Sequence, residues 1–202
     1  MEQLLTALLD LLFPPSQAEL LVRNASPESI FAEYRPSPFL HTICLCHYHT
    51  PLIRAAITQN KFHHDKNAAA HLGALLYAWH KIQPADTVYL PIPLSRQRER
   101  ARGYNQVTEI LKAAQLQSVT YSSVLRRTSH TSAQSTLDRN ARLKNVHNAF
   151  AVQTRELAAL QTKNIVVIDD VATTGATLLA AKQALLPHVP TQTKLTLLAL
   201  AH

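Results

Sequence analysis

Glycine is scarce in this sequence, with three glycines among 202 residues. The chain contains neither the G-x-G-x-x-G fingerprint of dinucleotide-binding folds nor the G-x-x-x-x-G-K-[ST] loop of P-loop proteins, so both readings lose their main support. No internal repeat is visible, and 16% charged residues with eleven prolines argue against low complexity. Because 47% of the residues are hydrophobic, we expect one globular domain, or one domain with an appendage.

Cysteine is also rare. The two cysteines, Cys44 and Cys46, are spaced C-x-C, so they give no disulfide framework and do not match the C-x-x-C of a zinc knuckle. Three histidines that could complete a metal site lie nearby: His41, His47 and His49. The alternating pattern of residues 42–48 instead favours a strand with partly buried thiols. We therefore expect no zinc, and we expect a cytoplasmic protein.

Long hydrophobic runs are missing as well. The leucine-rich start carries Glu2 and Asp10, lacks the basic region of a signal peptide and stops at Pro14, short of a bilayer's thickness. Its leucines fall on one helix face: Leu4, Leu5, Leu8, Leu9 and Leu12. We predict no membrane span but a helix that docks on this protein or on a partner. Residues 1–38 then form a helical appendage and connector, with a second helix signal at Ser26-Pro27-Glu28.

Acidic residues are outnumbered, 13 against 20 lysines and arginines, which gives a net charge of +7. This balance favours anionic partners such as phosphates or nucleic acid, although net charge alone indicates only non-specific attraction. Aromatic residues make up 6% of the chain, which weakens the case for base stacking on single-stranded DNA.

Strand and helix patterns alternate along residues 39–202, which predicts an α/β domain with a mostly parallel central sheet flanked by helices. Predicted strands cover residues 39–48, 87–94, 118–125, 164–168 and 194–201. Predicted helices cover residues 51–62 and 67–82, a segment through Val107, Ile110, Leu111 and Ala114, and the segment after residue 176. A long polar stretch separates residue 126 from residue 148.

The stretch NIVVIDDVATTGATLLAAKQALL, from Asn164 to Leu186, gives the clearest functional signal. A buried strand runs into Asp169 and Asp170, and ligands of parallel sheets bind beyond the carboxyl ends of the strands. Two carboxylates can each accept a hydrogen bond from the vicinal hydroxyls of a sugar, and they attract the water shell of Mg²⁺. The pattern therefore predicts a sugar-binding strand end.

The following turn consists of Thr173, Thr174, Gly175, Ala176 and Thr177. It supplies threonine hydroxyls, backbone N–H groups and a glycine that can adopt a positive φ, just before a helix N-terminus that favours anions. Such a turn suits a phosphate monoester, and together with the acids it describes a ribose 5-phosphate site. The alternative is a purely structural strand–helix junction with Thr174 as the N-cap.

Four arginines follow the strand at residues 87–94: Arg96, Arg98, Arg100 and Arg102. Together with the turn that ends at Pro93, they can bring guanidinium groups and amides to a pyrophosphate. The alternative is an ordinary solvated basic helix face.

Three segments, in order, resemble the ComF/GntX-type phosphoribosyltransferase-like family, whose founding members act in natural competence. They are PIPLSRQRERARGYNQ (residues 91–106), QSTLDRNARLKNVHNAF (residues 134–150) and VVIDDVATTGATL (residues 166–178). Family members commonly carry a cysteine-rich zinc module after the N-terminal helix, and here no cysteine precedes Cys44. The zinc module is therefore expected to be lost or replaced, which puts in doubt any role that depends on it.

The resemblance implies a type I phosphoribosyltransferase fold that binds phosphoribosyl pyrophosphate (PRPP). It assigns the ribose to Asp169 and Asp170, the 5-phosphate to the turn from Thr173 to Thr177, and the pyrophosphate to Pro93, Arg98 and Arg102. It further implies a loop that closes over the substrate, with Gln134, Arg142 and Asn145, and a hood at residues 51–82 that contains Lys61.

The activity implied is a glycosyltransferase reaction of nucleoside metabolism, in which a nitrogen nucleophile takes the phosphoribosyl group and pyrophosphate leaves. Mg²⁺ would be held through PRPP and water, with no direct protein ligand. The acceptor is not indicated, because the hood shows no base-recognition pattern. The alternative is a non-catalytic PRPP-binding competence protein that handles single-stranded DNA, alone or with another competence protein.

Overall fold

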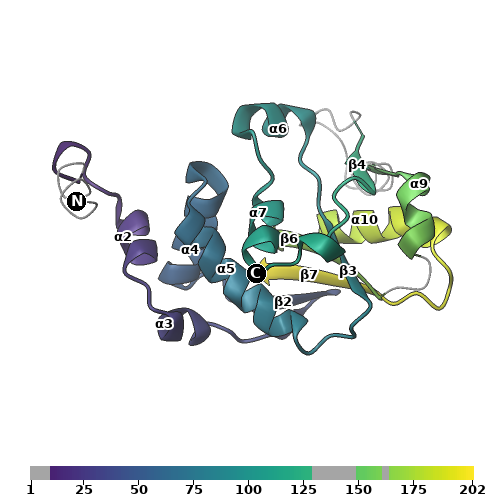
Figure 1. The fold of residues 1–202 in the computed structure, drawn as a ribbon, viewed down its shortest axis with the longest axis horizontal. Coiled ribbons are helices and arrows are strands. Elements are labelled where there is room, and N and C mark those ends of the chain that lie inside the picture. The colour runs from purple at the N-terminus through teal and green to yellow at the C-terminus, as the bar shows by residue number, and fades with distance from the viewer. Residues whose placement is uncertain (1–9, 129–148, 161–163) are drawn as a thin grey trace.

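A computed structural model describes residues 10–128, 149–160 and 164–202. Its main sheet has five strands in the order β1-β2-β7-β6-β3 (Figure 1). Their bounds are Ser37–Phe39 (β1), Thr42–Cys46 (β2), Thr87–Pro91 (β3), Asn164–Val171 (β6) and Leu195–Ala201 (β7). Strands β2, β7, β6 and β3 are parallel, and β1 is an antiparallel edge strand. The predicted α/β class with a mostly parallel sheet is confirmed.

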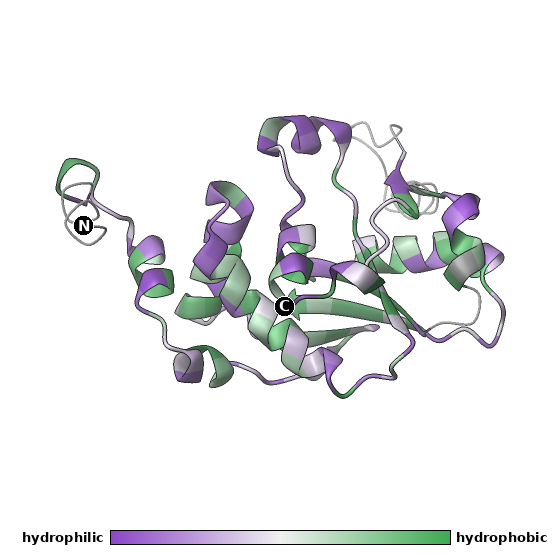
Figure 2. Cartoon of the chain, viewed as in Figure 1, coloured by the Kyte–Doolittle hydropathy of each residue, from purple (hydrophilic) through white to green (hydrophobic). Residues whose placement is uncertain are grey.

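Helices cover both faces of this sheet. One hydrophobic core joins it to α4 (Pro51–His63), α5 (Lys66–His80) and α7 (Gln106–Ala113). The other joins it to α10 (Ala176–Leu185) and to a small sheet of β4 (Leu125–Arg127) and β5 (Phe150–Val152). Figure 2 shows the strands of the main sheet as largely hydrophobic, because helices bury them on both sides.

The predicted helices at 51–62 and 67–82 are confirmed within a few residues, and their boundaries have local causes. Pro51 starts α4, where its missing N–H is not needed, and His64 ends the helix in the left-handed region at φ 52°. The Asp65 carboxylate then accepts hydrogen bonds from the backbone N–H groups of Asn67 and Ala68, which caps α5.

The segment before the sheet packs onto these helices through α2 (Gln17–Arg23) and α3 (Pro27–Phe31). Ser26 caps α3 as predicted, whereas α2, capped by Ser16, was not predicted. Val22 and Ile30 are buried in the core beside α4 and α5. The predicted boundary at residue 38 stays a prediction, and Leu4, Leu5, Leu8 and Leu9 lie outside the described residues.

Two strand predictions need correction. The single strand predicted at 39–48 is instead the end of β1 at Phe39, a turn in which Leu40 adopts a φ of 54°, and β2, which ends at Cys46. The strand predicted at 118–125 is wrong: the chain makes a 3-10 turn at Gln117–Val119 and a single bridge between Thr120 and Tyr89. The Thr120 hydroxyl donates to the Leu116 carbonyl at 2.7 Å, and such local bonds by short hydroxyl side chains compete with strand pairing.

The remaining elements are α6 (Arg96–Arg102), η1 (Gln117–Val119), α9 (Thr154–Leu157), η2 (Ala158–Leu160) and η3 (Leu186–His188). Within the three described ranges, every helix is too short or too polar to traverse a bilayer.

Candidate functional site

A cleft of about 880 Å³ lies where segments leave the carboxyl ends of β2, β3, β6 and β7. Helix α4 contributes Ile57, Thr58, Lys61 and Phe62 to its lining, and α6 contributes Arg98 and Arg102. This is the position where parallel α/β sheets bind ligands, and the volume falls within the range of small-molecule sites.

The two predicted acids form part of the cleft lining, at the end of β6. The backbone N–H of Asp170 donates to Asp169 Oδ1 at 2.9 Å, and that of Val171 donates to Asp170 Oδ1 at 3.0 Å. Asp170 is 4% exposed, and among the described residues its Oδ2 has no hydrogen-bond donor. A buried acceptor without a donor is costly, so this oxygen is suited to receive one from a ligand.

The charged form of Asp169 is unfavourable, because the side chain is buried and lies beside a second carboxylate. Burial, reinforced by the neighbouring Asp170 carboxylate, raises the pKa of Asp169 well above its ordinary value of 3.8. Lys61 from α4 acts in the opposite direction, and its Nζ lies 3.6 Å from Asp170 Oδ2. Hydroxyl donors or a cation brought by a ligand would relieve the same strain.

The threonine turn connects the acids to α10. Gly175 is the N-cap of α10 and adopts a φ of 68°, the positive φ that the sequence predicts for this glycine. The Thr174 hydroxyl accepts a long hydrogen bond, 3.4 Å, from the Ala176 N–H, which is part of the capping role in the structural alternative. Thr173 and Thr177 line the cleft, whereas Thr174, Gly175 and Ala176 are not among its lining residues.

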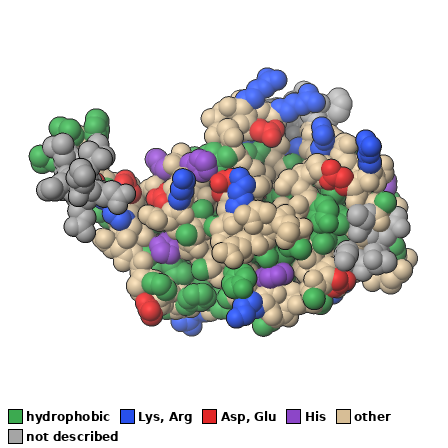
Figure 3. Space-filling model, in the orientation of Figure 1, with side chains coloured by type: hydrophobic (Ala, Val, Ile, Leu, Met, Phe, Trp, Pro, Cys, Tyr) green, Lys and Arg blue, Asp and Glu red, His purple; other side chains and the backbone are tan. Residues whose placement is uncertain are grey.

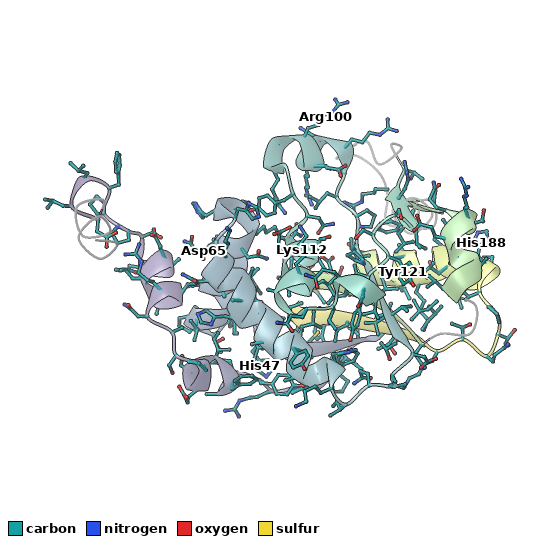
Figure 4. All side chains as sticks on the ribbon, in the orientation of Figure 1. His47, Asp65, Arg100, Lys112, Tyr121 and His188 are labelled. Atoms are coloured by element: carbon teal, nitrogen blue, oxygen red, sulfur yellow. The ribbon has the colours of Figure 1, made fainter. Side chains whose placement is uncertain are left out.

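Helix α6 carries the arginines. Ser95 caps it, and Gly103 at φ 77° ends it. Arg98 and Arg102 line the cleft together with Pro93, and residues four apart share one helix face. Arg96 and Arg100 do not line it, and Arg100 projects outward from the top of α6 (Figure 4). Figure 3 shows Lys and Arg side chains gathered over this part of the molecule.

The Arg102 side chain has two partners among the described residues. The Arg102 guanidinium donates to the Gln106 side chain, and it lies 5.6 Å from the centre of the Phe62 ring. Phe62 also approaches the Lys61 ammonium group, at 5.8 Å. The Phe62 ring, which is 65% exposed, attracts both cations through its electron-rich face.

Sequence reasoning missed Arg127 on β4, which also lines the cleft. Burial and the nearby charge of Arg98 lower the pKa of Arg127, and Asp169 partly offsets this effect. Its guanidinium lies 5.6 Å from the Phe150 ring, and its Nε has no hydrogen-bond partner among the described residues. The sequence around Arg127 has no local pattern that would assign it to the site, because the pairing of β4 with β5 places this arginine at the cleft.

The far end of the cleft is lined by ring-bearing residues that the sequence did not assign to the site: Phe39, His47, Tyr48, His49 and His202. The sequence pattern suggests His47 and His49 only as possible metal ligands. In the part of the chain that the structure describes, no cluster of three or more His, Cys, Asp and Glu side chains could hold a metal ion.

Cys44 and Cys46 are fully buried free thiols. Burial raises the pKa of Cys44 to about 11 and that of Cys46 to about 12, so both thiols are protonated at neutral pH. The predicted loop residues Gln134, Arg142 and Asn145 lie outside the described residues.

The fold and the cleft thus define an α/β protein with a cleft at its strand ends that is lined by two carboxylates, a lysine and three arginines. No protein-family model matches the chain. The chain is 29% identical over 161 residues to the DNA utilization protein YhgH of Escherichia coli O157:H7 and of Shigella flexneri, an alignment that covers 75% of this chain and 68% of each relative. This is weak homology. A solved structure of the allosteric regulatory enzyme of purine biosynthesis aligns with a TM-score of 0.43 and 14% identity, over 70% of this chain and 30% of that chain.

Proposed function

We propose that the cleft binds PRPP and that the protein transfers its phosphoribosyl group to a nitrogen nucleophile, with release of pyrophosphate. One observation carries this proposal: a single cleft collects residues predicted for different parts of PRPP from segments far apart in the sequence. They are Lys61, Pro93, Arg98, Arg102, Asp169, Asp170, Thr173 and Thr177.

The acid pair is suited to the ribose. Its hydroxyls would donate to the Asp169 and Asp170 carboxylates, including the Asp170 Oδ2 that has no hydrogen-bond donor among the described residues. The 5-phosphate would accept from N–H groups and hydroxyls of the turn before α10, whose N-terminus favours negative charge.

The pyrophosphate would lie against Arg98, Arg102 and Arg127. As the nitrogen of the acceptor bonds to C1 of the ribose, the bond from C1 to the pyrophosphate oxygen breaks, and its electron pair leaves with the pyrophosphate. Guanidinium groups in the cleft lining would stabilise the charge that develops on the pyrophosphate. Stabilisation of the leaving group can provide most of the catalysis in such a transfer.

Mg²⁺ fits this cleft as a companion of PRPP. Protein sites often hold Mg²⁺ through one or two carboxylates, water and substrate phosphates. Among the described residues, Asp169 and Asp170 are the carboxylates that line the cleft, and they would hold the ion through its water shell. The bound ion would supply charge neutralisation for the pyrophosphate.

The test is pyrophosphate release from PRPP and Mg²⁺ with a panel of nucleobases and amides. We expect release that depends on one class of acceptor and that is lost in the Asp169→Asn/Asp170→Asn variant. PRPP binding without release for any acceptor would contradict the transferase proposal.

That outcome would favour the second candidate, a non-catalytic PRPP-binding protein that handles single-stranded DNA, alone or with another competence protein. The relatives named for DNA utilization, the net charge of +7 and the outer arginines of α6 support it. A PRPP titration alone does not separate the two, because both include PRPP binding. The cytoplasmic location stays a prediction.

A further inference from the structure

The end of the cleft away from the arginines carries a group of rings, which we call the histidine wall: Phe39, His47, Tyr48, His49 and His202. His47 to His49 follow β2, and His202 follows β7. The wall therefore unites residues from opposite ends of the described chain, and none of them lies in the hood predicted at residues 51–82.

The rings of the wall form two sets of contacts, one among Phe39, His47 and His202 and one between Tyr48 and His49. Phe39 and His202 are stacked, with centroids 4.4 Å apart and planes inclined by 14°. His47 meets His202 edge-on at 5.0 Å, and Tyr48 meets His49 edge-on at 6.3 Å. The backbone fixes this arrangement, because the N–H of Tyr48 donates to the His202 carbonyl at 2.7 Å.

The charge of the wall differs from that of the opposite end. Burial, together with the neighbouring His47 and His49, lowers the pKa of His202 below its ordinary value of 6.5, which favours the neutral imidazole. At the opposite end, Arg98 and Arg102 carry full positive charges. A pyrophosphate would favour the arginines, which leaves the wall for an uncharged group.

Strand order separates these two ends. In the strand order β1-β2-β7-β6-β3, Phe39 ends β1, and the other residues of the wall follow β2 and β7. The acid pair lies at the end of β6, and the arginines follow β3. A ribose held by Asp169 and Asp170 would then lie between the wall and the arginines. The group that bonds to C1 can reach the ribose from the wall side.

We infer that the histidine wall is the acceptor subsite and that the acceptor is a planar nitrogen heterocycle of the nucleobase type. This inference rests on the proposed function and names its second substrate. Aromatic and imidazole rings stack on flat heterocycles, and imidazole nitrogens can donate or accept hydrogen bonds at the ring edge. Replacing a stacking side chain by alanine typically costs about 1–3 kcal/mol of binding free energy per base. This corresponds to roughly 5- to 150-fold in affinity.

The test compares ribose 5-phosphate with a panel of nucleoside 5′-monophosphates by calorimetry. A nucleoside monophosphate carries the same ribose phosphate plus a base. The difference between the two affinities therefore measures how the base interacts with the histidine wall. We expect at least one of them to bind the unmodified protein at least tenfold more tightly than ribose 5-phosphate does. The His47→Ala/His49→Ala variant should lose this preference and retain its affinity for ribose 5-phosphate.

A matched control is His188→Ala. This histidine lies beyond α10, at the far right in Figure 4, well away from His47. Its substitution should leave both affinities unchanged. The Phe39→Leu variant, which keeps an apolar side chain and removes the ring, should also lower the preference.

The outcomes distinguish the two levels of proposal. If ribose 5-phosphate binds but no nucleoside monophosphate binds better, the acceptor subsite is wrong and the PRPP site stands. Equal losses for both ligands in the wall variants would also overturn the inference, because they indicate a structural role. If neither PRPP nor ribose 5-phosphate binds, the proposed function itself fails.

Discussion

Two neighbouring carboxylates end β6, and burial makes the first of them unfavourable in its charged form. Asp169 therefore retains its proton to a higher pH in the folded chain than in the unfolded chain. Its contribution to the free energy of unfolding falls as the pH rises from its ordinary pKa of 3.8 through the raised folded value. The site is built at the expense of stability, as functional sites often are.

The Asp169→Asn variant should accordingly be more stable than the unmodified protein in the absence of ligand at neutral pH. We expect the Tm to rise by roughly 2 to 4 °C, the shift that about 1 kcal/mol produces in a domain of this size. Thermal melts across the pH range provide the measurement, and the gain should vanish below the ordinary pKa of the carboxyl. A variant less stable than the unmodified protein at pH 7 would show that the pair is not strained.

The double variant Asp169→Asn/Asp170→Asn tests the ribose assignment. It keeps the shape of both side chains and removes charge-assisted acceptors, each worth about 1.5 to 3 kcal/mol. We expect the protein to fold and its PRPP affinity to fall at least tenfold, measured by calorimetry. Unchanged affinity would remove the acid pair from the site.

At the scale of elements, α6 presents two different arginine faces from one short helix. Arg98 and Arg102 face the cleft, whereas Arg96 and Arg100 do not line it. This division offers matched controls within seven residues of sequence.

If the inner pair holds pyrophosphate, Arg98→Ala and Arg102→Ala should weaken PRPP far more than ribose 5-phosphate, by about tenfold for a lost charged hydrogen bond of 1.5 kcal/mol. Arg96→Ala and Arg100→Ala should leave both affinities unchanged. Titrations of the four variants with both ligands provide the measurement. Equal effects on PRPP from all four would contradict the division of faces.

The same four variants test the nucleic-acid alternative. If α6 follows a single-stranded DNA backbone, each substitution should weaken DNA binding by a similar amount. Each should also reduce the slope of log affinity against log salt by about 0.7 per lost contact. DNA binding that is lost evenly and is insensitive to PRPP would favour the second candidate function.

The helices and strands also show which features of the fold and of the site can be predicted from the sequence. Hydrophobic periodicity predicted α4 and α5, and unbroken apolar runs predicted the central strands, whose residues are largely buried. The acid pair was found at its strand end for the same reason. Arg127 was missed because β4 and β5 pair across more than twenty intervening residues, and no local pattern encodes such a contact. The histidine wall was missed because residues 39 and 202 meet only in the folded sheet.

At the scale of the whole molecule, ligand binding and folding are linked, because the cleft is formed by strands and helices from most of the chain. PRPP with Mg²⁺ at about 100 times its Kd should add roughly 2.7 kcal/mol to the free energy of unfolding. The Tm should then rise by roughly 5 to 11 °C. Thermal melts with and without millimolar PRPP provide the measurement, with the double aspartate variant as the control. The absence of any shift would count against the site.

The strand order of the sheet has a stereochemical consequence for the proposed transfer. The acids of β6 lie between the histidine wall, which follows β2 and β7, and the arginines, which follow β3. An acceptor on the wall and a pyrophosphate on the arginines would therefore meet the ribose from opposite sides. Displacement from opposite sides inverts the anomeric carbon, so α-configured PRPP would give a β-configured product. The coupling constant of the anomeric proton in a nuclear magnetic resonance spectrum of the product would report that inversion.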